Sequence, residues 1–179
     1  MGAALDRSVA ERKNAIAGEA PRLMRYACAL LRDRREAEDL VHDCIVRALA
    51  NLASWREDDS PRKWLFTILH NVHVDRMRAR ARRPVTAPLE DGFEGVGVPA
   101  HGADVTFGEI DRALAALPLE QRQCVLLIGL EGMGYAEAAG MLDVPVGTVM
   151  SRLSRGRERL RVLLEQGVAR PATVLRRIK

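Results

Sequence analysis

The chain has 179 residues, of which 47% are hydrophobic, 4% aromatic and 29% charged. That length is enough for one ordinary domain or two small ones, and the balance favours compact helical bundles over disorder. The formal net charge of +4 favours a polyanionic partner. No apolar run is long enough to span a bilayer, and the N-terminal residues lack the apolar segment of an export signal. A cytoplasmic protein is therefore expected.

Helical periodicity recurs along the chain, and strand patterns are almost absent. A first helix is predicted to start at Pro21, because proline is favoured in a first turn. A second helix is predicted to start at Asp33, whose carboxylate can accept backbone N–H groups, with Glu36 three residues later as in a capping box. A third long helix starts at Pro61 and ends in the basic stretch RMRARARR.

Residues 84–108 differ in composition from the rest of the chain. They contain three prolines, five glycines and four acidic residues but no Lys or Arg, although the chain has 28 basic residues. This composition predicts a flexible acidic linker. The sequence therefore predicts an all-α protein with two small helical domains, at 1–83 and 109–166. A tail at 167–179 follows, with no function indicated by its pattern.

The stretch GYAEAAGMLDVPVGTVMSRLSRGRERL has the layout of a helix-turn-helix, with DVP as the turn and Val146 at the start of the second helix. Val149, Leu153, Gly156 and Leu160 are predicted to face inward. The opposite face carries hydroxyls and guanidiniums that can bond phosphates or base edges. These candidate DNA-binding residues are Thr148, Ser151, Arg152, Arg155 and Arg159. An arginine-rich solvated helix is the alternative, but it would need no such preceding turn.

The polar side of the helix from Asp33 is rich in carboxylates. It carries Glu38, Asp39, His42, Asp43 and Arg47. Such a face would repel DNA and suits a basic protein surface. The alternative is ordinary helix solubility together with favourable negative charge near a helix N-terminus.

The helix from Pro61 and the loop before it combine aromatic, amide and cationic side chains, which can hold unstacked single-stranded bases. The candidates are Trp55, Lys63, Trp64, Thr67, His70, Asn71, Arg76 and Arg78. Two alternatives remain. Trp64 can be a core residue, and Asn71 can form a local structural pair with Asp75, four residues further on.

Three segments, in this order and with this linker, resemble the extracytoplasmic-function group of bacterial RNA polymerase sigma factors. They are AEDLVHDCIVRAL, WLFTILHNVHVDRMRARARR and LPLEQRQCVLLIGLEGMGYAEAAGMLDVPVGTVMSRLSRGRERL, and the resemblance covers about residues 20–165. It implies two domains, called regions two and four, that direct core RNA polymerase to promoters. It also implies an anti-sigma partner and no enzymatic activity, small-molecule substrate or cofactor.

The resemblance also assigns roles to the candidate residues. The acidic helix would dock on the clamp of the β′ subunit, and the C-terminal domain would contact the β flap. The loop Ala53–Ser60 and the helix from Pro61 would capture flipped bases of the minus-ten element, with Asn71 at the polar position of the family's base pocket. The second helix of the helix-turn-helix would bind the minus-thirty-five element, and the linker would run toward the active-site cleft and RNA exit path.

The chain departs from the family pattern at several positions. Met150 stands where a lysine is frequent, and His42 replaces a common glutamine. The loop ASWREDDS is idiosyncratic, so the minus-ten sequence does not follow from the resemblance. The rival functions are a non-sigma regulator with a sensory N-terminal domain and a DNA recombinase. The first needs a ligand pocket or phosphoacceptor and the second a nucleophilic Ser or Tyr among arginines; neither pattern is found.

The three cysteines, Cys28, Cys44 and Cys124, are far apart in sequence and lack the spacing of metal ligands. Each lies in an apolar helical stretch, which predicts buried free thiols and no metal site.

Overall fold

The computed structural model describes residues 2–56, 60–82 and 107–168, and every regular element within them is helical. The N-terminal lobe consists of α1 (Gly2–Leu31), α2 (Arg34–Ala50), the short 3₁₀ helix η1 (Leu52–Ser54) and α3 (Pro61–Arg82). The C-terminal lobe consists of α4 (Phe107–Ala115), α5 (Leu119–Val125), the π-helical turn η2 (Leu126–Leu130), α6 (Tyr135–Leu142) and α7 (Val146–Val168). The all-α prediction is confirmed, whereas most of the predicted linker and tail lies outside the described residues.

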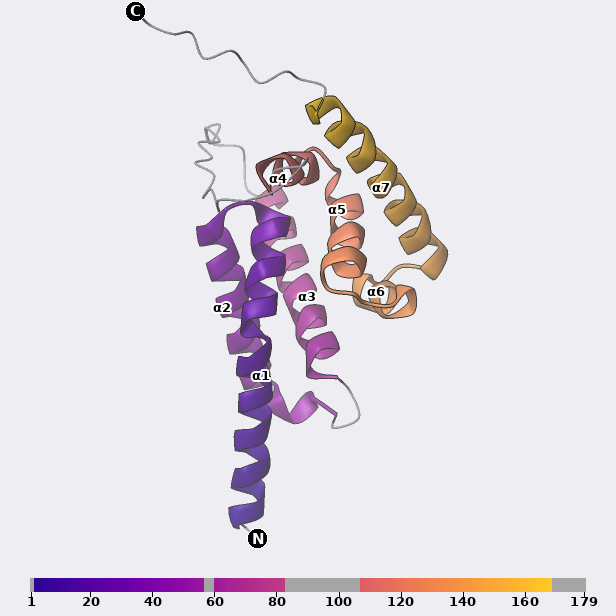
Figure 1. Ribbon diagram of the computed structural model, residues 1–179. Helices are drawn as coiled ribbons and strands as arrows, with labels where there is room; N and C mark the ends of the chain where they lie inside the picture. Colours follow the sequence, from indigo (N-terminus) through magenta and orange to yellow (C-terminus); the bar gives the residue numbers. More distant parts are fainter. Residues whose placement is uncertain (1, 57–59, 83–106, 169–179) are drawn as a thin grey trace, which may run out of the picture.

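The first helix is longer than the sequence predicted. It begins at Gly2, so Pro21 lies inside it and not at its start. Proline removes one helical hydrogen bond, but tertiary contacts hold the part of the helix that precedes it. Ile16 is buried, and Arg12 donates a hydrogen bond to the carbonyl of Leu52 at 3.2 Å. Tertiary contacts therefore override the boundary signal, and the N-terminal end of α1 projects beyond the other helices (Figure 1).

The start of α2 is as predicted, because Asp33 Oδ1 accepts the backbone N–H of Glu36 at 2.9 Å. In the core between α1, α2 and α3, the Tyr26 ring meets Phe66 edge-on at 5.2 Å between centroids. Burial raises the pKa of the Cys44 thiol to about 12. The other fully buried large side chains of this core are Ile16, Leu23, Leu30, Leu40, Leu65 and Leu69. Of the three free cysteines, Cys44 and Cys124 are buried as predicted, whereas Cys28 is only half-buried.

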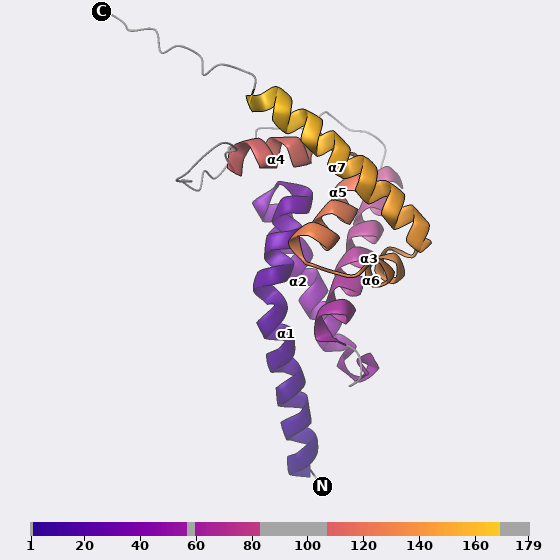
Figure 2. The same ribbon diagram turned by 45° about the vertical axis from the view of Figure 1, so that its right-hand side comes forward.

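The predicted helix-turn-helix is present. The backbone N–H of Gly134 donates to the Glu137 carboxylate at 2.9 Å at the start of α6. Asp143, in the turn, has a left-handed backbone with φ of +52°, and the N–H of Thr148 donates to the Pro145 carbonyl at 2.9 Å as α7 begins. The turn therefore places α7 on the outer side of the lobe, across α5 (Figure 2).

The inner face of α7 is close to the predicted one. Val149, Leu153 and Gly156 are buried, and Leu160 is half-buried. A Cβ atom at Gly156 would lie 2.8 Å from Val125 Cγ2 and 3.4 Å from backbone of α5. Glycine therefore permits the close approach of α7 to α5.

Replacing Gly156 by Val is expected to lower the free energy of unfolding of the C-terminal lobe by about 1–3 kcal/mol, because extra methyl groups overfill this contact. Gly147→Val is the matched control on the same helix, since a Cβ there meets nothing within 4 Å. Urea unfolding followed by circular dichroism compares the two variants. Equal stability of the two would contradict the packing argument.

The two lobes are in contact. Helix α6 lies against α3, and α5 with η2 lies against α1 (Figures 1 and 2). Arg32 pairs with Asp111 at 3.1 Å, and Arg122 donates to the Leu30 carbonyl at 2.8 Å, so polar contacts also join the lobes. No helix in the described part of the chain is long and apolar enough to cross a membrane.

Candidate protein and nucleic-acid interfaces

The polar face of α2 is exposed and lies beside the basic half of α3. All five residues singled out on this face are exposed: Glu38, Asp39, His42, Asp43 and Arg47. A surface hollow of about 370 Å³ lies between the two helices. It is lined by Asp39, His42, Asp43, Arg76, Ala79 and Arg80.

Ion pairs between α2 and α3 neutralise part of this acidic face. Arg76 donates to the Asp43 carboxylate and, at 2.9 Å, to the main-chain oxygen of Asp39. Arg47 pairs with Asp75 at 3.1 Å, so Asp75 is engaged by α2. Arg76, which the sequence indicated as a DNA contact, therefore points toward α2, while Arg78 is exposed. Sequence spacing within one helix gave no signal for these interhelical pairs.

The two tryptophans stack on each other. The ring centroids of Trp55 and Trp64 are 5.8 Å apart at 16° between planes, and the guanidinium of Arg12 lies 5.8 Å from the Trp55 ring centroid. Trp55 is only 8% exposed, and Trp64 is half-buried. In this arrangement the Trp55 ring is covered by α1 and is not open to a nucleic-acid base.

The exposed side of α3 carries polar residues at helical spacing. Lys63 and Asn71 are exposed, whereas Thr67 and His70 are half-buried. Burial lowers the pKa of His70, an effect that the nearby charge of Asp143 partly offsets. Because Asp143 belongs to the turn before α7, the helix-turn-helix lies over the part of α3 that carries His70.

The outer face of α7 holds the residues predicted to bind duplex DNA. Arg155 and Arg159 are exposed, as is Ser151. The Ser151 hydroxyl donates to the Thr148 carbonyl at 3.0 Å. Arg152 is less open, because its side chain is 26% exposed and lies 3.7 Å from the Glu120 carboxylate of α5.

An apolar surface between α6 and α7 was not singled out from the sequence. Tyr135 is 43% exposed and Met150 is 53% exposed. They border a hollow of about 520 Å³. Its lining consists of Tyr135, Met150, Leu153, Ser154, Arg157, Glu158 and Arg161. The only sequence signal was Met150, where a lysine is frequent in the family.

The likeness to known proteins covers both lobes. Residues 107–160 match the family described as sigma-70, region 4, and residues 16–70 match the sigma2 domain of PhyR. The chain is 35% identical over 144 residues to the ECF RNA polymerase sigma factor EcfG of Rhodopseudomonas palustris, which is 80% of each chain. The chain belongs to the ECF RNA polymerase sigma factors.

Two further comparisons agree with this assignment. The sigma factor SigM of Mycobacterium tuberculosis is 39% identical over 143 residues, covering 79% of this chain and 71% of SigM. The fold matches that of the sigma factor RpoE of Bartonella quintana, solved in complex with the anti-sigma factor NepR. That match has a TM-score of 0.71 and 31% identity and covers 86% of this chain and 96% of the other. The resemblance drawn from the sequence is therefore confirmed.

Proposed function

We propose that this sigma factor docks on core RNA polymerase through the exposed face of α2 and binds promoter DNA through α3 and α7. The supporting observation is the separation of charge. Carboxylates are exposed on α2 of one lobe, and the guanidiniums of Arg155 and Arg159 are exposed on α7 of the other. An acidic face suits a basic protein surface, and a cationic helix of a helix-turn-helix suits the major groove.

The functional division follows the lobes. Residues 1–83 form the unit for polymerase binding and the minus-ten element, and 109–166 form the unit for the minus-thirty-five element. Residues 84–108 link them, and 167–179 form a tail. The protein acts without catalysis of its own, in the cytoplasm, where polymerase and chromosome are present.

Within the minus-ten unit, Lys63, Thr67, His70, Asn71 and Arg78 face the DNA. Trp55, directly after η1, stacks on Trp64 of α3, so the face of each ring in this stack is not open to a base. Arg76 has a linking role, because it joins the docking face on α2 to the DNA-binding helix α3.

Promoter binding requires the lobes to separate. The minus-ten and minus-thirty-five elements are about 25 base pairs apart, which is about 85 Å of duplex at roughly 3.4 Å per base pair. Helix α6 touches α3 in the structure, so the two DNA-binding surfaces are much closer than that. The residues from 83 to 106 would reach about 80 Å if fully extended, a span comparable with that separation.

An anti-sigma factor controls this separation. The similar sigma factor RpoE was solved in complex with the anti-sigma factor NepR. A partner that binds only the closed arrangement shifts the equilibrium away from the promoter-binding form.

Co-purification with core RNA polymerase tests the proposed function. A tagged full-length chain is expected to retain the polymerase subunits through washing, as identified by mass spectrometry. A helix-turn-helix regulator that is not a sigma factor would retain DNA but no core enzyme.

Replacing Asn71 by Ala is expected to slow promoter opening several-fold, because the exposed amide would hold a flipped base. Permanganate reactivity of the holoenzyme on linear DNA measures the open complex. A premelted template should recover part of the loss, since the cost of unstacking is already met. Equal opening by wild type and variant on linear DNA would assign Asn71 no part in base capture.

A further inference from the structure

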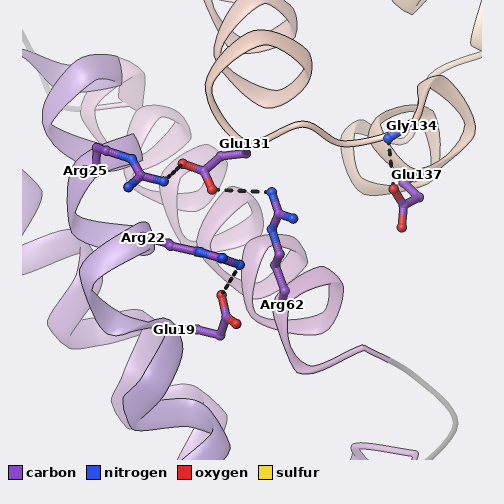
Figure 3. Close-up of polar contacts among 7 residues, drawn as sticks. All are labelled: Glu19, Arg22, Arg25, Arg62, Glu131, Gly134 and Glu137. Carbon is purple, nitrogen blue, oxygen red and sulfur yellow. Dashed lines mark hydrogen bonds and ion pairs between the residues drawn. The ribbon is translucent and has the colours of Figure 1, made fainter.

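One carboxylate of the C-terminal lobe is held by two arginines of the N-terminal lobe (Figure 3). Glu131, directly after η2, has a side chain that is only 1% exposed. Its Oε1 accepts a hydrogen bond from Arg25 of α1 at 2.9 Å, and its Oε2 accepts one from Arg62 of α3 at 3.4 Å. This contact therefore joins the two lobes through a buried, charged group.

The backbone fixes the position of Glu131. Its N–H donates to the Leu126 carbonyl at 3.0 Å and closes the π-helical turn, a feature frequent at functional sites. Gly132 follows with φ of +63°, a backbone conformation that favours glycine. The N–H of Met133 then donates to the Leu127 carbonyl at 2.9 Å. The carboxylate is thus presented to the arginines by an ordered turn.

Separation of the lobes removes this carboxylate from its two arginines. Of the neighbouring charges, Arg22 lies 3.6 Å from Glu19 and already has its own partner (Figure 3). Arg25 and Arg62 are then left on the N-terminal lobe without the carboxylate that both contact. Two such charges attract an anion.

The geometry of Arg62 fits an anion with more acceptor oxygens than a carboxylate. Its Nε is buried and has no hydrogen-bond partner among the described residues, so the guanidinium keeps an unused donor beside Glu131. Guanidiniums bind carboxylates and phosphates through the same fork of N–H groups. A phosphate can therefore replace the carboxylate and use the third donor as well.

We propose that Arg25 and Arg62 form a binding site for a backbone phosphate of the opened promoter strand, and that Glu131 occupies this site while the lobes are in contact. The proposal rests on the proposed promoter binding. Arg62 directly precedes Lys63 at the start of α3, the helix that carries Asn71, so the site lies beside the path assigned to the minus-ten strand. Glu131 and DNA compete for the same arginines, which couples lobe separation to DNA binding.

The first test uses the full-length chain and a fluorescein-labelled oligo(dT) of about 12 nucleotides, whose phosphates require no promoter sequence. Glu131→Gln keeps the shape of the side chain and removes its charge. We expect this variant to bind the oligonucleotide roughly three- to tenfold more tightly and to have a larger radius of gyration in small-angle X-ray scattering. Unchanged affinity would overturn the proposal that Glu131 occupies the site.

The second test removes the arginines from the opened form. Relative to Glu131→Gln alone, the same chain with Arg25→Ala and Arg62→Ala is expected to bind the oligonucleotide at least about fivefold more weakly. The slope of the logarithm of the binding constant against the logarithm of the salt concentration (the salt slope) should decrease in magnitude by about 1.4. This is about 0.7 for each lost contact with single-stranded phosphate. Lysine at both positions should restore part of the affinity.

The matched control has the same net charge as the variant that lacks Arg25 and Arg62, and it also carries the change that is expected to separate the lobes. It combines Glu131→Gln with Arg34→Ala and Arg35→Ala on α2, and it should bind like Glu131→Gln alone. If the arginine pair instead bound an acidic protein segment, removing it would leave oligonucleotide affinity unchanged, and the phosphate site would be overturned. Helical circular dichroism of every variant separates loss of the site from loss of the fold.

Binding of wild type to core RNA polymerase is measured in parallel. A wild-type chain that does not bind core enzyme contradicts the proposed function. If the chain binds core enzyme but its affinity for the oligonucleotide does not change when Arg25 and Arg62 are replaced, only the proposed phosphate site is contradicted.

Discussion

Replacing Asp39 by Lys is expected to weaken binding of this sigma factor to core RNA polymerase by at least about 30-fold. Asp39 is exposed on α2 and borders the hollow between α2 and α3. A charge-assisted contact that becomes buried in an interface is worth about 2–5 kcal/mol when one partner is removed. A loss of about 2 kcal/mol corresponds to roughly 30-fold in Kd. Binding of labelled protein to purified core enzyme measures the change.

The structure makes Asp39 a better choice than Asp43. The Asp43 carboxylate pairs with Arg76, so reversing its charge also breaks an intramolecular contact with α3. Arg76 meets Asp39 only through the main-chain oxygen, which a side-chain replacement retains. Glu11→Lys on α1 makes the same change of charge at an exposed position and is the matched control. If both variants bound core enzyme like wild type, the docking face would not be on α2.

Local signals in the sequence were sufficient to predict several features of the fold. The cap at Asp33 depends on a side chain and a backbone group three residues apart, so its pattern is visible in the sequence. The turn before Val146 is equally local, since Asp143 and Pro145 supply its backbone conformation and its first hydrogen bonds. Such features need no knowledge of how distant segments pack.

Features that depend on distant partners were missed. Proline at position 21 is a strong local signal for a helix start, but packing of α1 against η1 carries the helix through it. The pairing of Arg76 with Asp43 joins residues 33 apart, and that of Glu131 with Arg25 joins residues 106 apart. Glu131 in particular was not among the residues singled out from the sequence, because its two partners belong to the other lobe.

Replacing Arg155 by Ala is expected to relax sequence preference in the minus-thirty-five element. Arg155 is exposed in the first half of α7, the half that enters the major groove in helix-turn-helix proteins. Loss of a base contact there should cost about 1–3 kcal/mol at the affected base pair, or roughly 5- to 150-fold. Binding of holoenzyme across a promoter library measures the preference at each position.

Arg152 requires an additional step, because its guanidinium lies near Glu120 of α5. It must exchange this carboxylate for DNA, so Arg152→Ala is expected to have a smaller effect on preference than Arg155→Ala. Glu120→Gln should then increase the contribution of Arg152. The expected ranking of these two effects follows from the exposure of the two arginines in the structure. It was not apparent from the sequence, where both lie on the same predicted face.

Replacing Arg159 by Ala should weaken binding to all promoters about equally. Arg159 is exposed one turn beyond Arg155, where we expect α7 to leave the groove toward the phosphates. The salt slope of holoenzyme binding should fall by about one unit for one lost phosphate contact. Neither variant should unfold the lobe, because Val149 and Leu153 on the opposite face pack against the core. A uniform loss for Arg155→Ala, with base preference intact, would mean that Arg155 contacts the backbone and that base recognition belongs to another face of α7.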